Sequence, residues 1–185
     1  LPLDVVQARS RDALVAELPL VLGDARLHLL VNNAGLLHGG ERFGHVDASD
    51  LAASLQTNAV GPFVLTQALA PLLADGDSDG SRPGAVVANL SSEIGALALR
   101  AEFRTPSYAM GKAAQNMGTV LLARAVAGRG IRVVALHPGW VRTDMGGEQA
   151  PLGADEAVAA LLATLGRLQP DETGVFLDRD GQPLP

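Results

Sequence analysis

Three short apolar runs, each followed by a turn, constrain the fold of this 185-residue chain more than any other feature. They cover residues 27–31, 85–90 and 131–136, and a fourth, shorter run follows at 174–177. Runs of this length are typical of buried strands, and the Asn, Ser, Pro and Gly residues that follow the first three are typical of tight exit turns. These segments are therefore predicted to be strands that are covered on both faces.

Segments with helical character separate these strands. Strands that alternate with helices favour a parallel α/β sheet with helices on both faces, whose ligands bind beyond the carboxyl ends of the strands. A surface loop rich in Asp, Gly, Ser and Pro is predicted at residues 75–83. The helices are predicted over residues 10–18, 47–74, 106–127 and 154–168, with Ser10, Asp47 and Thr105 as N-caps of the first three.

Composition narrows the class of protein. The chain is 48% hydrophobic and has a net charge of -6, with no basic run that would suit nucleic acid. It has no cysteine, which excludes disulfides and thiolate metal sites. No apolar stretch is long enough for a membrane span, and no leader pattern is present. We expect one domain over residues 1–185, in a soluble cytoplasmic protein that binds neither nucleic acid nor membrane.

Two residues on the third predicted helix carry the first chemical signal. Tyr108 is the only tyrosine and Lys112 the only lysine, and a four-residue spacing places both on one helix face. A nearby ammonium group stabilises a phenolate, so Lys112 is predicted to lower the pKa of Tyr108 toward neutrality. Taken alone, the pair fits equally well a half-buried tyrosine beside a solvated lysine.

Two further residues extend this signal. Ser92 ends a predicted strand at the edge of the sheet that the Tyr108 helix should face, where its hydroxyl can donate to a carbonyl oxygen; Ser91 is expected only to cap the turn. Asn58 lies in the middle of a predicted helix, four residues before Pro62. Because proline has no N–H, the Asn58 carbonyl should be free to hold a water that leads to Lys112, although an ordinary proline kink explains the same pattern.

Taken in order, these motifs resemble the short-chain dehydrogenase/reductase family. The resemblance rests on residues 32–35 (Asn-Asn-Ala-Gly), Asn58, Ser92, the Tyr108/Lys112 pair and the Pro-Gly turn at 138–139. The sixteen-residue step from Ser92 to Tyr108 and the run from 137 to 147 are most similar to the C-factor/sniffer-like carbonyl reductase branch. The resemblance implies a Rossmann-type sheet and NAD(P)-dependent reduction of a carbonyl to a secondary alcohol, or the reverse.

The resemblance also implies a role for each matching position. Tyr108 would transfer the proton, Lys112 would lower its pKa and bind the nicotinamide ribose, Ser92 would orient the carbonyl and Asn58 would hold the relay water. The cofactor would be NADP or NAD, and the small-molecule substrate a carbonyl compound or an alcohol. Besides Tyr108 and Lys112, the implied cofactor-binding residues are Asp4, Val5, Asn33, Ala34, Gly35, Pro138, Gly139, Val141 and Thr143.

The chain departs from the family pattern in two places. Position 111 is Gly where the family usually has Ser, which is expected only to loosen the helix. The family's first two strands and the Gly-rich turn that binds pyrophosphate have no match, and the chain begins at Leu1 within what looks like the tail of the third strand. We therefore expect an N-terminally truncated domain, an apolar edge strand at 27–31 that residues 1–5 can pair with only weakly, and poor turnover.

Other readings stay open at this point. A truncated, catalytically impaired relative could act as a binding or signalling module, although its intact Tyr108/Lys112 pair argues against this. A hydrolase that uses Ser92 is a weak alternative, because no Gly-x-Ser-x-Gly elbow is present. A homodimer through the two long helices is slightly favoured. Neither the substrate nor the choice between NAD and NADP can be read from the sequence.

Overall fold

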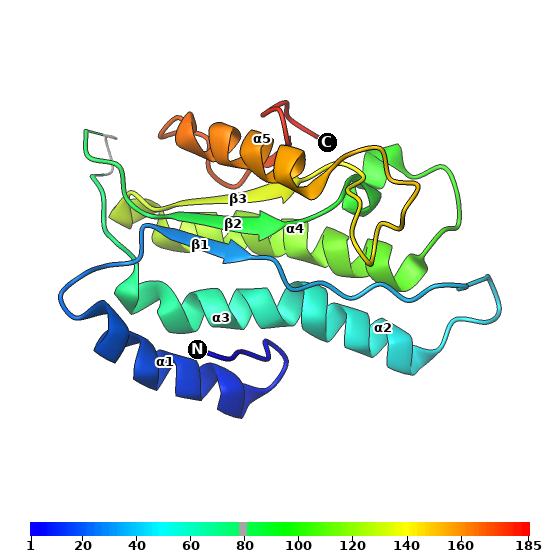
Figure 1. Cartoon of the computed structure of the whole chain (residues 1–185), viewed down its shortest axis with the longest axis horizontal. Helices are drawn as coiled ribbons and strands as arrows, with labels where there is room; N and C mark the ends of the chain where they lie inside the picture. Colours follow the sequence, from blue (N-terminus) through cyan, green and yellow to red (C-terminus); the bar gives the residue numbers. More distant parts are fainter. Residues whose placement is uncertain (78–80) are drawn as a thin grey trace.

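A four-stranded parallel sheet forms the centre of the computed structural model, which describes residues 1–77 and 81–185 (Figure 1). The strands lie side by side in chain order, and each pairs in parallel with the next. Helices provide the crossovers between them, so the predicted Rossmann-type α/β class is confirmed. The strands are β1 (Leu29–Asn32), β2 (Val86–Leu90), β3 (Arg132–His137) and β4 (Phe176–Asp178).

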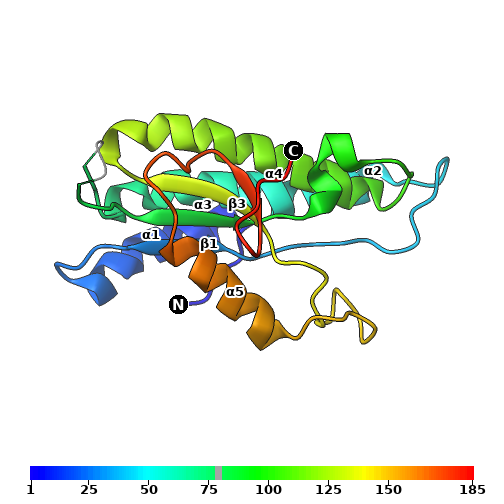
Figure 2. The ribbon, with the colours of Figure 1, turned by 90° about the horizontal axis from the view of Figure 1, so that it is seen from above.

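In the part of the chain that the structure describes, five α-helices flank the sheet on its two faces (Figures 1 and 2). Helix α5 lies alone on one face and the other four lie on the opposite side, where α1 contacts α3 and has no buried residue of its own. Within the described residues, no helix combines the length and apolarity needed to cross a bilayer. The helices are α1 (Ala8–Leu22), α2 (Ala48–Leu55), α3 (Gly61–Leu69), α4 (Pro106–Val126) and α5 (Ala154–Gly166).

The apolar runs of β2 and β3 are continuous because both faces of these strands are buried. Val87 and Val133 pack with Leu122 of α4 in one core. The alternate positions, among them Val134 and Leu136, pack toward α5 in a second core. Successive side chains of a strand point to opposite faces, so apolar residues fill most positions on both faces, as the strand prediction required. The buried exception is Asn89, whose side chain is hydrogen-bonded to those of Asn32 and Thr119.

Strand β1 is an edge strand, as expected, and its Leu29 and Val31 side chains remain 40% and 43% exposed. Residues 1–5 neither pair with β1 nor form a strand of their own, so the prediction of a strand tail there is wrong. The Asp4 carboxylate accepts hydrogen bonds from Val6 N–H (2.9 Å) and the Gln7 amide (2.7 Å). These bonds turn the chain directly into α1.

The first two predicted helices differ most in their bounds from the helices in the structure. Helix α1 begins at Ala8, so Ser10 is no N-cap; its hydroxyl instead accepts a hydrogen bond from Asp4 N–H (2.8 Å). The segment predicted as one helix over 47–74 is divided by a π-helical turn, η1 (Gln56–Val60), between α2 and α3. Asp47 precedes α2 but makes no side-chain cap, and neither does Thr105 before α4. Residues 78–80 of the predicted loop at 75–83 lie outside the described part of the chain.

Truncation of a buried leucine should lower the free energy of unfolding more than truncation of an exposed leucine. Leu136→Ala removes a fully buried side chain from β3 and should lower the free energy of unfolding by about 2–5 kcal/mol. Leu162→Ala on α5 is the matched control, because that side chain is 53% exposed, and should cost about 0.5 kcal/mol or less. Urea unfolding followed by circular dichroism measures both. Equal losses for the two variants would contradict the packing described here.

Candidate active site

Helix α4 brings Tyr108 and Lys112 together at the carboxyl edge of the sheet. The Lys112 ammonium nitrogen lies 5.5 Å from the centre of the Tyr108 ring, which agrees with the predicted shared face. Lys112 is only 3% exposed, and its Nζ donates to the Leu90 carbonyl oxygen (2.6 Å) and to Gln115 Oε1 (3.0 Å). Burial lowers the pKa of Lys112 from 10.5 to about 8, because the charged ammonium group loses hydration in the interior.

Ser92 follows β2 and faces Tyr108. Its hydroxyl accepts a hydrogen bond from Ile94 N–H (3.3 Å) and lies near enough to the Tyr108 phenol to affect the pKa of that phenol. Ser92 is therefore the residue that caps the turn after the strand. Ser91, predicted to do so, is buried and bonds instead to Asn116 Oδ1 on α4 (2.6 Å).

The predicted lowering of the pKa of Tyr108 is not found in this structure. Burial of the phenol raises its pKa above 10.0, and the nearby Ser92 hydroxyl opposes this rise. Lys112 does not reverse the shift, because a lysine whose pKa is about 8 is already neutral at the pH where the phenol titrates. Tyr108 is thus protonated at neutral pH, the form of a general acid.

Asn58 lies within η1, where the helix is wider than an α-helix because its backbone hydrogen bonds span five residues rather than four. Gly61 N–H bonds to the Gln56 carbonyl, five residues back, as in a π-turn. The Asn58 side chain is fully buried and pairs with both backbone groups of Leu36 at 2.8 Å, through its Oδ1 and Nδ2. This amide thereby fixes the segment that leaves β1, a role that the sequence did not indicate.

The residues implied for cofactor binding lie along the same edge of the sheet, apart from Asp4 and Val5. Asn33, Ala34 and Gly35 are exposed directly after β1, and Gly139 after β3 has a φ of 86°, which favours glycine. The loop after Gly139 folds on itself, because Thr143 Oγ1 accepts from Gly146 N–H (3.2 Å). Pro138 and Val141 are half-buried beside it, and Val141 forms a bridge with Leu152.

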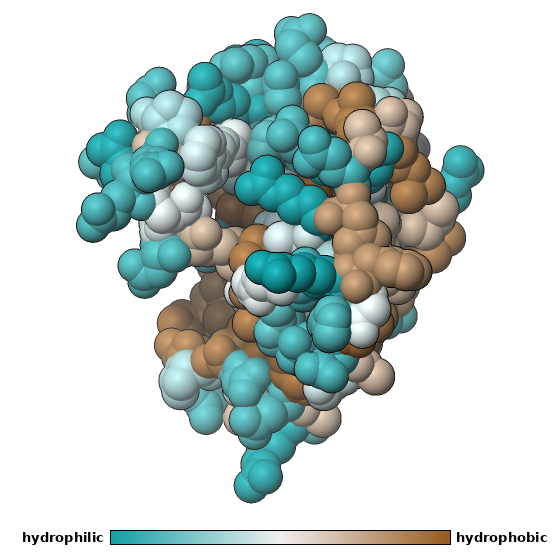
Figure 3. Space-filling view, turned by 90° about the vertical axis from the view of Figure 1, so that its right-hand side faces the viewer, coloured by the Kyte–Doolittle hydropathy of each residue, from teal (hydrophilic) through white to brown (hydrophobic). Residues whose placement is uncertain are grey.

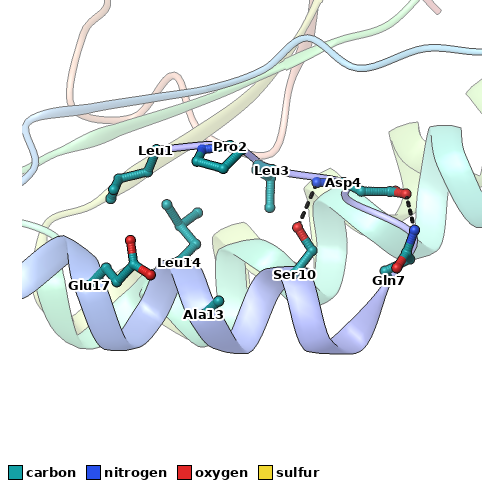
Figure 4. A pocket seen from close by; sticks show the side chains of 9 residues that line it. All are labelled: Leu1, Pro2, Leu3, Asp4, Gln7, Ser10, Ala13, Leu14 and Glu17. Atoms are coloured by element: carbon teal, nitrogen blue, oxygen red, sulfur yellow. Dashed lines mark hydrogen bonds between the residues drawn. The ribbon is translucent and has the colours of Figure 1, made fainter.

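Asp4 and Val5 precede α1, apart from this edge. Val5 packs against the backbone of Gly61, where an added Cβ would lie 3.0 Å from the valine side chain. The two hydrogen bonds to the Asp4 carboxylate lower its pKa. A hollow of about 420 Å³ lies between this N-terminal segment and α1. Figure 4 shows the side chains that line it, Asp4 among them.

Figure 3 views the molecule from the side toward which the strands point and shows a recess in that surface, with both hydrophilic and apolar residues around it. Glu93 and His137 are also at this end of the sheet, and His137 Nε2 lies 3.9 Å from Glu93 Oε2. Burial lowers the pKa of His137. The Ser92 hydroxyl accepts from Ile94 N–H, and no histidine in the described part of the chain is hydrogen-bonded to it, which gives the hydrolase alternative no support.

Sequence reasoning missed several polar residues that surround the site. Ser54 and Gln115 are buried beside the predicted residues, and Glu41 reaches the start of α4. Spacing offered a signal for two of them: Ser54 precedes Asn58 by four residues and Gln115 follows Lys112 by three, so each shares a helix face with its neighbour.

The buried ammonium group of Lys112 predicts a pH-dependent stability. The folded state binds this proton less tightly than the unfolded chain does, so the unfolding free energy should rise with pH between about 8 and 10.5. Lys112→Met removes this titration. The difference in unfolding free energy, parent minus variant, should therefore increase by up to about 3 kcal/mol across that interval.

Urea unfolding of both proteins at a series of pH values measures this difference. Groups that titrate away from Lys112 are the same in both proteins and cancel in the comparison. A difference that stays constant from pH 7 to pH 11 would contradict a lowered pKa for Lys112.

Comparisons with known proteins agree with this geometry. C-signal from Myxococcus xanthus is 37% identical over 159 residues, which cover 85% of this chain and 91% of that protein. The carbonyl reductase Sniffer of D. melanogaster superposes with a TM-score of 0.92 at 34% identity, over 100% of this chain and 76% of that one. The NADPH-bound carbonyl reductase from chicken fatty liver gives a TM-score of 0.89 at 33% identity, over 99% and 75%.

The family model described as short chain dehydrogenase matches residues 1–151, which include all four predicted catalytic positions and every predicted cofactor-binding position. The two carbonyl reductases share the architecture of the sheet over nearly the whole chain. The chain therefore belongs to the short-chain dehydrogenase family, with C-signal and Sniffer-type carbonyl reductases among its relatives.

Proposed function

We propose that this chain is an NAD(P)-dependent oxidoreductase that reduces a small carbonyl compound to a secondary alcohol, or catalyses the reverse reaction. One observation carries the proposal: the Ser92 hydroxyl lies beside the Tyr108 phenol at the carboxyl edge of a parallel sheet, with the Lys112 ammonium nitrogen 5.5 Å from the centre of the tyrosine ring. A hydroxyl donor and a proton donor so placed can act on the same carbonyl oxygen.

The charge states of these residues suit reduction. Burial keeps the Tyr108 phenol protonated at neutral pH, so it is ready to give its proton to the oxygen that gains negative charge. Ser92 would orient that oxygen with its own hydroxyl hydrogen. Lys112, whose pKa is about 8, is mostly charged at pH 7 and would stabilise the phenolate that Tyr108 becomes.

The exposed turns at the strand ends fit a dinucleotide, and two carbonyl reductases of similar structure are described as bound to NADPH or NADP. When bound, NADPH or NADH would supply the hydride for reduction, and NADP⁺ or NAD⁺ would accept it in the reverse reaction. Asn33, Ala34 and Gly35 would contact the adenosine ribose, and Lys112 the nicotinamide ribose. Asp4 and Val5 would lie at the adenine ring, and Pro138, Gly139, Val141 and Thr143 at the nicotinamide end.

Asn58 would connect this site to solvent. Pro62 supplies no N–H to the Asn58 carbonyl oxygen, which can therefore accept a hydrogen bond from water in the widened turn η1. Such a water would pass a proton between bulk solvent and Lys112. We include in the proposal that residues 1–185 form one NAD(P)-binding domain.

A second candidate is a non-catalytic signalling module. The relative named C-signal favours it, because the chain matches 91% of the length of that protein. The intact group of Ser92, Tyr108 and Lys112 favours the enzyme. Nucleotide binding separates the two, since only the oxidoreductase needs NADPH or NADH.

Removal of the phenol oxygen tests the enzyme directly. Tyr108→Phe should reduce turnover of a carbonyl substrate by about 10²–10⁴-fold, because the proton donor is lost while the ring that packs near Lys112 remains. Turnover is followed by the oxidation of NADPH or NADH across a panel of aldehydes and ketones.

NADPH fluorescence titration of the same variant is the control, and the dissociation constant should stay within a few-fold of the parent's. Activity that survives Tyr108→Phe would refute the role given to Tyr108. A parent chain that binds neither nucleotide would favour the signalling module.

A further inference from the structure

Three polar residues are fully buried where α2 and η1 meet α4, next to Tyr108. Ser54, Asn58 and Ser107 are each 0% exposed. Asn58 Nδ2 donates to Ser54 Oγ at 2.9 Å, and Ser54 Oγ donates in turn to the backbone carbonyl of Ser107 at 2.9 Å. The Ser54 hydroxyl thus connects Asn58 with the residue that directly precedes Tyr108.

The glycine at position 111 leaves room for this contact. A Cβ added to Gly111 would lie 3.1 Å from Ser54 Oγ and 3.2 Å from both Cβ and Nδ2 of Asn58. The expectation that Gly111 merely loosens the helix is therefore wrong: the missing side chain lets the two helices approach closely. The family usually has a serine at this position of α4. In this chain the Ser54 hydroxyl, from the facing helix α2, lies close to the same place.

A second contact holds the same residue from the opposite side. Ser107 N–H donates to Glu41 Oε2 at 3.4 Å, so both backbone groups of Ser107 are bonded to other parts of the chain. Glu41 belongs to the loop that follows β1, and Leu36, whose backbone pairs with Asn58, belongs to that loop too. One connected set of hydrogen bonds therefore joins the exit of β1, the turn η1 and the start of α4.

We propose that Ser54 is a positioning residue that links Asn58 to Tyr108 through the Ser107 carbonyl. This inference rests on the proposed function, in which Tyr108 transfers the proton and Asn58 serves the relay. Ser54 touches neither substrate nor cofactor. Its hydroxyl fixes the first turn of α4 against α2, and this packing keeps the phenol in its half-buried position.

Ultraviolet titration of tyrosinate tests the link without any turnover, because Tyr108 is the only tyrosine in the chain. Loss of the Ser54 hydroxyl should loosen the first turn of α4 and admit water to the phenol. Burial is what raises the pKa of Tyr108, so Ser54→Ala should move that pKa down toward 10.0. Ser49→Ala on the same helix is the matched control, since Ser49 is exposed, and it should leave the titration unchanged.

Two more variants test the same link, and a third replaces Ser54→Ala if that variant does not fold. Ser54→Thr keeps a hydroxyl and should retain the parent titration, whereas Gly111→Ala pushes Ser54 and Asn58 away from α4 and should shift it as Ser54→Ala does. If Ser54→Ala does not fold, Ser54→Cys keeps the volume with weaker hydrogen bonds and is judged by the same shift.

A Tyr108 pKa that is the same in Ser54→Ala and Ser49→Ala would overturn the proposal, whatever happens to stability, because Ser54 would then be merely structural. That result would leave the oxidoreductase proposal standing. If Tyr108→Phe stays active, the oxidoreductase proposal fails, but the titration still shows whether Ser54 controls the burial of Tyr108.

Discussion

Close packing of α4 is the constraint on which the rest of the site depends. Two glycines permit it: a Cβ on Gly95 would lie 2.7 Å from the Lys112 backbone, and one on Gly111 would press on Ser54 and Asn58. With no side chain at either position, the turn after β2 and the α2–η1 helix both reach the α4 backbone. Lys112 is enclosed between them, and polar groups on three elements come within hydrogen-bond distance.

This enclosure shifts the pKa values of Tyr108 and Lys112. Burial raises the pKa of Tyr108 and lowers that of Lys112, so each group is shifted toward its neutral form. The hydrogen bonds from Lys112 to Leu90 and Gln115 offset part of the solvation that its charge loses. In the proposed reaction, charge that develops on the carbonyl oxygen and then on the phenol would be stabilised by groups that are already in place, with little water to reorganise.

The sequence was sufficient for the α/β class and for the approximate strands, because a strand buried on both faces must be a continuous apolar run. It also predicted that Ser92, Tyr108 and Lys112 would meet, since strand ends share one edge of a sheet and a four-residue spacing shares one helix face. It could not predict the contacts of Ser10 or Ser54, because serine bonds equally well to many partners and the choice depends on tertiary packing. The direction of the Tyr108 pKa shift was missed for the same reason: spacing reveals a nearby charge but not the extent of burial.

In the proposed reaction, Tyr108 is the proton-transfer group and a dinucleotide is the hydride carrier. ¹³C NMR of the chain labelled at the tyrosine Cζ measures the protonation of Tyr108 directly, because the single tyrosine gives one resonance. Titration with pH should give a pKa above 10.0 without nucleotide, and a lower value when NADP⁺ saturates the protein, since a positive charge near the phenol stabilises the phenolate. A nucleotide that binds without moving this pKa, or no binding at all, would contradict the account.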